Sequence, residues 1–148
     1  MENPITWLLI ADASKARVYA LHKVLFLQHP TANSLQLIQD FTHDESRKKK
    51  SELVSDKMGE FGSGTFVETT SPKLHEAEVF AQELLEFIRK NHEKGVFRDL
   101  ILVSPPTFMG LLHKHIPTQV KKSVSQNIEK DYTQNNEQQL VQNLLPHF

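Results

Sequence analysis

The chain has 148 residues, enough for one domain with a single core, and its 39% hydrophobic and 24% charged residues are typical of a globular protein. It contains no cysteine, which excludes disulfides, cysteine-bound metals, iron-sulfur clusters and thiol nucleophiles. The formal net charge is -1, so any contact with a nucleic acid would depend on local basic patches.

Three strands are expected in the first part of the chain. Residues 5–11 are β-branched or apolar and have no polar alternation, which is typical of a central strand covered on both faces. A turn at 12–15 leads to a second strand at 16–22, which could continue to Leu27, and a third strand follows at 35–41. The short connections between these strands favour an antiparallel meander.

The second part of the chain alternates helices and strands. A long helix is predicted to start at Pro72, with Ser71 as its N-cap, and to end before Gly95. A buried strand at 97–104 and a helix at 107–116 follow. Residues 120–132 are ambiguous between helix and strand, and we predict a strand over 123–129, then a last helix over 136–145.

This order of elements predicts a mixed sheet. Each strand-helix-strand unit makes a right-handed parallel crossover, whereas the first three strands form an antiparallel meander. We therefore predict a single α/β domain over 1–148 with a ribonuclease-H-like, five-stranded mixed sheet and helices packed on it. The strand at 5–11 would be central, between the meander and the crossover strands.

A long connection from Asp44 to Pro72 separates the meander from the long helix. Connections longer than about 12–15 residues are usually functional or disordered. Residues 52–56 could fold back on the sheet, which would leave 57–70 as the mobile part. Exposed cations and aromatic rings in such a loop could bind RNA or a protein, although solvation and packing on the domain explain them too. The candidate binding residues are Arg47, Lys48, Lys49, Lys50, Gly59, Phe61, Gly62, Gly64 and Phe66.

Several segments, taken in order, resemble the bacterial family of host attachment proteins, described as required for attachment to host cells. The matching segments are Trp7 to Asp12, Ala16 to Tyr19, Glu52 to Asp56, His75 to Ala77 with Phe80 and Ala81, Leu102 to Pro106 with Phe108, Gly110 to Leu112, and Glu129 to Asp131 with Thr133. The resemblance implies a fold similar to the middle domain of archaeal and eukaryotic peptide-chain release factors, and a link to the ribosome.

The chain departs from that pattern in two places. Release factors use a Gly-Gly-Gln loop before the long helix to promote peptidyl-tRNA hydrolysis, but no glutamine occurs between Asp44 and Pro72, so the resemblance does not carry this activity over. Where the family often has an arginine after the Gly-x-Leu segment, this chain has His113. A phosphate contact by that arginine is therefore not expected.

An enzyme remains an alternative prediction. Asp12 ends the first strand, where ribonuclease-H-like nucleases place a metal-binding aspartate, so a metal-dependent phosphoesterase or peptidyl-tRNA hydrolase-like enzyme could use Asp12, His75 and Glu76. Two-metal chemistry needs several converging carboxylates. Glu76 or Glu78 could supply a second, but the strand end at 104–106, where a third is expected, reads Ser-Pro-Pro. An Asx turn explains Asp12 more simply, as helix capping explains His75 and Glu76.

Two further candidate sites are weaker. Ser14, Lys15 and Arg17 share a short polar turn, which could bind a phosphate or could simply be solvated. The eight histidines lack metal-site spacing, because His113 and His115 are two residues apart and point to different faces of a helix. We therefore expect neither a metal nor a cofactor.

Our first prediction for function is a non-enzymatic cytosolic binding module that contacts RNA, a ribosome or a protein through the 44–72 loop. The first residues lack a basic segment, and Asp12 interrupts the apolar run far short of a bilayer span, so we expect neither export nor a membrane span. The alternatives are the enzyme above and an indirect role in attachment to host cells.

Overall fold

The computed structural model describes residues 5–43 and 72–148. They contain one five-stranded sheet with the order β3-β2-β1-β4-β5. The strands are β1 (Thr6–Ala11), β2 (Lys15–Leu21), β3 (Gln36–Thr42), β4 (Asp99–Val103) and β5 (Val124–Ile128). Strand β2 runs antiparallel to β1 and β3, while β4 runs parallel to β1 and β5. This mixed sheet with β1 at its centre confirms the predicted ribonuclease-H-like fold class.

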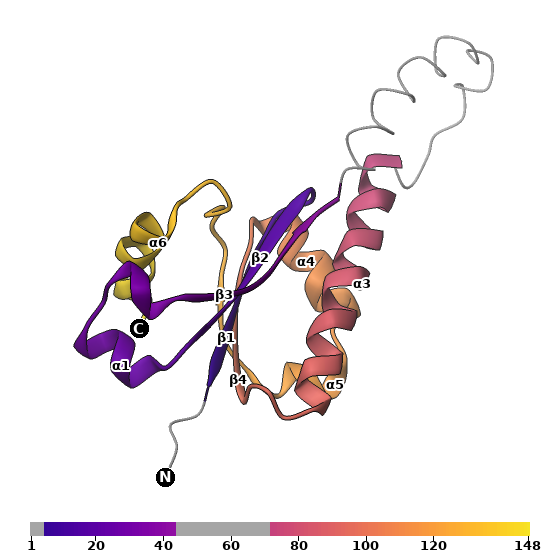
Figure 1. Cartoon of the computed structure of the whole chain (residues 1–148). Helices are drawn as coiled ribbons and strands as arrows, with labels where there is room; N and C mark the ends of the chain where they lie inside the picture. Colours follow the sequence, from indigo (N-terminus) through magenta and orange to yellow (C-terminus); the bar gives the residue numbers. More distant parts are fainter. Residues whose placement is uncertain (1–4, 44–71) are drawn as a thin grey trace, which may run out of the picture.

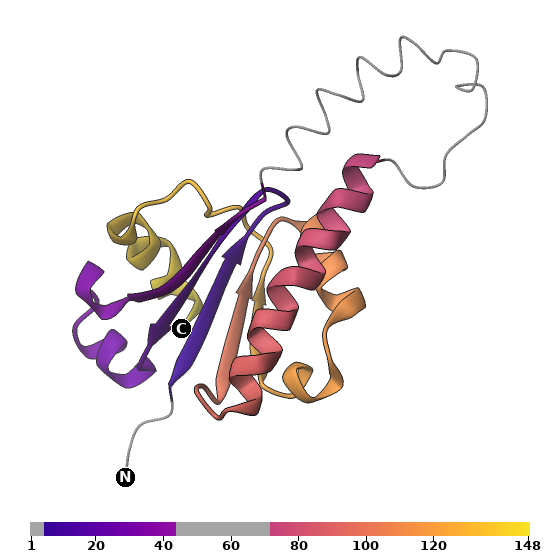
Figure 2. The ribbon, with the colours of Figure 1, turned by 45° about the vertical axis from the view of Figure 1, so that its right-hand side comes forward.

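Helices cover both faces of the sheet. Figures 1 and 2 show α3, α4 and α5 on one face and α1 and α6 on the other. The helices are α1 (Lys23–Gln28), α3 (Pro72–Glu93), α4 (Pro106–His115), α5 (Thr118–Lys121) and α6 (Glu137–Leu144), with 3-10 turns η1 (Ala32–Ser34) and η3 (Leu145–His147). None of the helices in the described ranges has an apolar stretch long enough to cross a membrane.

The two faces of β1 build two hydrophobic clusters. Every residue of β1 is buried, and successive side chains of a strand point to opposite faces. Trp7 and Leu9 pack in the cluster under α3, α4 and α5, whereas Leu8 and Ile10 pack in the cluster that includes residues of α6. A central strand with cores on both sides explains why its sequence has no polar alternation.

The long helix α3 ends in a Schellman motif. Gly95 has a positive φ of 73°, its N–H donates to the carbonyl of His92 at 3.0 Å, and the Val96 N–H donates to the carbonyl of Asn91 at 3.1 Å. These bonds satisfy helix carbonyls that would otherwise lack donors. The turn then directs the chain into β4 and leaves Val96 38% exposed.

One local prediction needs correction. The second strand does not continue to Leu27, because residues 23–28 form α1, in which Phe26 is buried and Val24 and Leu27 are exposed. The strand predicted over 123–129 is confirmed as β5, and the first residues of the ambiguous region 120–132 complete the short helix α5. The proposed N-cap Ser71 and the fold-back of 52–56 lie outside the described residues.

Candidate functional site at the carboxyl end of the sheet

Asp12 follows β1 and closes the turn to β2. Its Oδ1 accepts hydrogen bonds from the backbone N–H groups of Ser14 at 2.8 Å and Lys15 at 2.9 Å. The Asp12 N–H donates to the Lys15 carbonyl at 2.9 Å. This is an Asx turn, the simpler of the two roles expected for this residue.

The second carboxylate oxygen of Asp12 binds the segment that follows β5. The hydroxyl of Thr133 lies 3.0 Å from Asp12 Oδ2 and 2.6 Å from Asp131 Oδ1. A hydroxyl has one proton to donate, so the two carboxylates share one donor. Thr133 is buried, and its backbone N–H also donates to Asp131 Oδ1 at 3.2 Å. Both oxygens of Asp12 are thus engaged within the protein.

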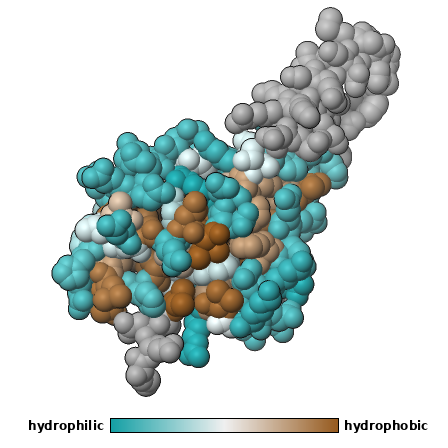
Figure 3. All heavy atoms as spheres, viewed as in Figure 1, coloured by the Kyte–Doolittle hydropathy of each residue, from teal (hydrophilic) through white to brown (hydrophobic). Residues whose placement is uncertain are grey.

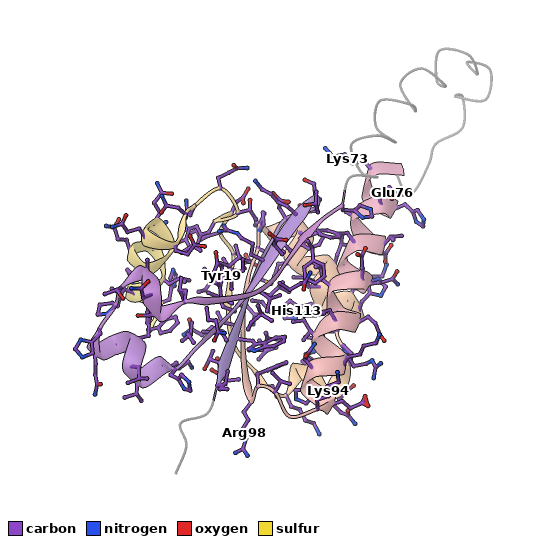
Figure 4. All side chains as sticks on the ribbon, in the orientation of Figure 1. Tyr19, Lys73, Glu76, Lys94, Arg98 and His113 are labelled. Atoms are coloured by element: carbon purple, nitrogen blue, oxygen red, sulfur yellow. The ribbon has the colours of Figure 1, made fainter. Side chains whose placement is uncertain are left out.

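His43 and Glu76 form a buried pair at the end of β3. His43 Nε2 lies 3.1 Å from Glu76 Oε1, and the side chains are 9% and 10% exposed. The His43 ring stacks on Phe80 with centroids 5.0 Å apart, and its Nδ1 lies 3.9 Å from Glu83 Oε1. Burying a carboxylate without a partner would be costly, so this contact stabilises the first turns of α3 against β3. Figure 4 shows Glu76 at this end of α3.

Backbone hydrogen bonding joins the pair to the Asx turn. The His43 N–H donates to the Ser14 carbonyl at 2.8 Å. A continuous series of contacts therefore crosses the carboxyl end of the sheet, which we call the sheet-end network, and it consists of Asp131, Thr133, Asp12, Ser14, His43 and Glu76. It connects the β5–α6 segment, the β1–β2 turn, the end of β3 and α3. His43 precedes segment 44–71 and Glu76 follows it, so the network fixes both sides of that segment.

Arg17 extends this arrangement toward α6. Its Nη2 donates to the carbonyls of Asn135 at 2.8 Å and Thr133 at 3.1 Å, and its Nη1 donates to Tyr19 Oη at 2.8 Å. The Tyr19 hydroxyl in turn donates to Glu137 Oε2 at 2.7 Å. Burial raises the pKa of Tyr19 to about 12, and the hydrogen bond to Glu137 adds to this. The hydrogen bond from Tyr19, with smaller contributions that include Arg17, lowers the pKa of Glu137.

These contacts bear on the phosphate hypothesis for the β1–β2 turn. Lys15, Arg17 and Asp40 line a small hollow of about 150 Å³ together with Thr133. Arg17 directs its terminal nitrogens to protein carbonyls and to Tyr19, and the carboxylate of Asp40 would repel an anion. The geometry favours a structural role for Arg17, and phosphate binding by Ser14, Lys15 and Arg17 stays a prediction.

The other candidate residues are dispersed. His75 is exposed on α3, whereas its neighbour Glu76 points into the network. His113, labelled in Figure 4, lies on α4, and its Nε2 is 2.8 Å from Asn127 Oδ1 of β5. Among residues 5–43 and 72–148, no three His, Asp or Glu side chains are grouped so that they could hold a metal.

Sequence reasoning missed His43. Its only local signal is its position as the last residue before the long polar connection, and its partner Glu76 lies 33 residues further along the chain. The nine candidate binding residues from Arg47 to Phe66 all lie outside the described residues.

The fold and the sheet-end network define a ribonuclease-H-like α/β domain in which His43 and Glu76, on the two sides of segment 44–71, meet at the carboxyl end of the sheet. The model of the family described as "Protein required for attachment to host cells" matches residues 7–144. The chain belongs to this family, which confirms the prediction made from its segments.

Several solved structures are similar to the chain, among them two of archaeal proteins. One is described as an archaeal protein (11% identity) and the other is the crystal structure of the archaeal translation termination factor aRF1 (13% identity). Both have a TM-score of 0.48 and cover 99% of this chain, which spans only 38% and 39% of their lengths. A search among curated proteins finds no match.

Proposed function

We propose that this member of the host attachment family is a non-enzymatic binding module of the cytoplasm that contacts RNA, ribosomal RNA included, through residues 44–72. The observation that carries the proposal is the anchoring of this segment by the buried contact of 3.1 Å between His43 and Glu76. The contact fixes the positions from which the segment leaves and re-enters the domain. Restricting a binding segment before it meets its ligand lowers the entropic cost of association.

The sequence close to this anchor suits a phosphate backbone. Four consecutive cations, Arg47 to Lys50, begin four residues after the buried His43. Lysine and arginine side chains that neutralise phosphates release counterions, which gives affinity without base readout. Phe61 and Phe66 could add stacking on bases. These properties support RNA as the partner.

The hydrogen bonding of the acidic candidates supports binding over hydrolysis. Asp12 accepts hydrogen bonds at both carboxylate oxygens, and Glu76 is buried against His43. A metal-bound water or a general base needs carboxylate oxygens directed at an open site. Here both oxygens of Asp12 and Oε1 of Glu76 instead face other parts of the protein. Since the family is described by attachment to host cells, RNA binding inside the cell would make that effect an indirect one.

RNA binding measured against salt concentration tests this proposal. We expect the parent to bind single-stranded RNA with an affinity that falls steeply with salt. In a variant with Arg47, Lys48, Lys49 and Lys50 changed to alanine, the slope should shrink by roughly 0.7 for each phosphate that the variant no longer neutralises. Co-sedimentation with ribosomes should weaken in parallel.

A matched control is available at the other end of the molecule. Lys94, Arg98, Lys121 and Lys122 are also three lysines and one arginine, so changing them to alanine removes the same charge. This control should keep RNA binding. No RNA binding at low salt, or equal losses in the two variants, would overturn the proposal. Magnesium-dependent hydrolysis that disappears in Asp12→Ala would indicate the enzyme instead.

A further inference from the structure

The amino end of the sheet, opposite the sheet-end network, combines exposed cations with exposed aliphatic side chains. We propose that this end is a docking surface for an anionic lipid bilayer. We call it the amino-end surface, and it consists of Lys94, Arg98, Lys121, Lys122, Val24, Leu27 and Val96. This contact goes beyond the proposed function, because it uses different residues at the opposite end of the domain.

The four cations of this surface are exposed and make no ion pair within residues 5–43 and 72–148. The acidic residues next to Lys94 and Arg98 in the sequence already have partners. Asp99 pairs with Lys23 at 2.9 Å, and Glu93 pairs with Arg89 at 2.5 Å. The positive charge of the surface is therefore not neutralised by its own neighbours.

Hydrogen bonds bring the cations together from three segments. His92 Nε2 lies 2.9 Å from Ser123 Oγ, which places residues 121–123 beside the end of α3. The Leu100 N–H donates to the Ser123 carbonyl at 2.9 Å, which connects the same segment to β4. Figure 4 shows Lys94 and Arg98 at the end of the molecule that is opposite Lys73 and Glu76.

Exposed aliphatic side chains lie at the same end. Val24 and Leu27 of α1 are each 51% exposed, and Val96 is 38% exposed between Lys94 and Arg98. The ion pair of Lys23 with Asp99 connects the start of α1 to the start of β4. Figures 1 and 2 show α1, α5 and the α3–β4 turn at one end, and Figure 3 shows apolar surface interspersed with polar surface there.

This combination fits an anionic bilayer better than a nucleic acid. Lysine and arginine can bind either a nucleic acid or an anionic bilayer. Exposed valine and leucine, however, add no affinity for phosphates, which bind through charge and hydrogen bonds. At a bilayer, aliphatic side chains enter the boundary between headgroups and acyl chains. Each lysine or arginine close to an anionic membrane surface raises partitioning by about fivefold. Both kinds of side chain thus contribute to the same contact.

Vesicle flotation at low salt tests the proposal with mixed phosphatidylcholine–phosphatidylglycerol vesicles and with pure phosphatidylcholine vesicles. The parent should float with the anionic vesicles only. Lys121→Glu with Lys122→Glu should lower partitioning by at least about 25-fold, since two favourable charges are removed and two unfavourable ones are added. Val24→Ser with Leu27→Ser should also weaken binding, because the apolar contribution is removed.

A matched charge reversal provides the control. Lys73→Glu with Lys130→Glu changes the charge by the same amount at exposed positions away from this surface, and it should leave flotation unchanged. All six side chains are exposed or partly exposed, and thermal unfolding of each variant checks that it folds.

Four results would overturn the proposal. The first is absence of flotation with anionic vesicles, and the second is unchanged flotation of the Lys121 and Lys122 variant. The third is loss of flotation in the Arg47 to Lys50 alanine variant alone, which would assign the attraction to the basic run. The fourth is a loss of RNA binding in the Lys121 and Lys122 variant that is larger than its loss of vesicle binding, which would make this end a nucleic-acid surface. RNA binding by the parent is measured separately, so the two proposals fail independently.

Discussion

At the carboxyl end of the sheet, Asp12, Thr133 and Glu76 are hydrogen-bonded within the fold, whereas at the amino end Lys94 and Lys122 face solvent and have no ion-pair partner in the described part of the chain. A polar group that is already satisfied inside the protein has little left to offer a ligand, and removing its partner costs stability. The first end therefore joins α3 to β3 and to the β1–β2 turn, and the second is free to make new contacts. Substitutions at the two ends should separate these roles.

The largest loss of stability is expected for Glu76→Ala. It leaves the buried His43 without its contact at 3.1 Å, and we expect a loss of about 2–3 kcal/mol in the free energy of unfolding, measured by denaturant titration. Glu83→Ala is the control, because Glu83 is half exposed and 3.9 Å from His43, and it should cost less than about 1 kcal/mol. Equal losses in the two variants would show that the buried contact between His43 and Glu76 does not stabilise the fold more than an exposed one does.

A smaller effect is expected for Asp12→Ala, which removes the acceptor for Ser14, Lys15 and Thr133 and should cost about 2 kcal/mol. Asp12→Asn keeps an oxygen that accepts the two backbone N–H groups and an amide that can donate to Thr133. We expect the asparagine variant to lose less than about 0.5 kcal/mol in the same titration. If asparagine costs as much as alanine, the negative charge is the essential property of this residue.

The burial of Tyr19 and its contact with Glu137 predict that the stability of the fold depends on pH in the alkaline range. Tyr19 keeps its proton in the folded protein up to about pH 12, whereas its ordinary pKa is 10.0. The folded state therefore binds more protons than the unfolded state in this interval. The stability that Tyr19 contributes is complete below pH 10 and should be lost as the pH rises through 12. Comparing unfolding of the parent and of Tyr19→Phe across this interval isolates the effect, and identical pH profiles would contradict it.

The smallest change in stability is expected for substitutions at the amino end of the sheet. Lys94→Ala and Lys122→Ala remove exposed cations, so the free energy of unfolding should change by no more than about 0.5 kcal/mol. The measurement is again denaturant titration. A loss comparable to that of Asp12→Ala would mean that these lysines are structural, which would remove the contrast between the two ends.

The sheet could be predicted because the apolar patterns that indicate its strands and helices lie within single short segments of the sequence. The run from Trp7 to Ala11 is apolar throughout because β1 is covered on both faces, and the apolar steps of α3 follow its buried side. Segment 23–28 was harder to assign, because its continuous apolar residues fit a strand as well as a helix. In the structure Phe26 alone of these residues is buried, so burial rather than composition distinguishes the two assignments.

The candidate site could be predicted only in part, because its contacts join distant segments. The Asx turn at Asp12 involves neighbouring residues and was expected from the sequence. From the sequence, Arg17 is a candidate phosphate ligand with solvation as the alternative, and in the structure it donates to the carbonyl of Asn135, which lies 118 residues away. Its donors could not be assigned without knowing that the segment after β5 returns to β2. His43 was missed for the same reason.

The stacking around Trp7 has a practical consequence. Trp7 is the single tryptophan of the chain, it is 1% exposed, and its ring stacks on Phe87 of α3 at 5.8 Å and on Phe97 at 4.7 Å. Its fluorescence therefore comes from one place, the seam where α3 meets β1 and the segment before β4. Opening of that seam would shift the emission to longer wavelengths without any attached label. The chain thus contains its own optical probe of how firmly the long helix is held on the sheet.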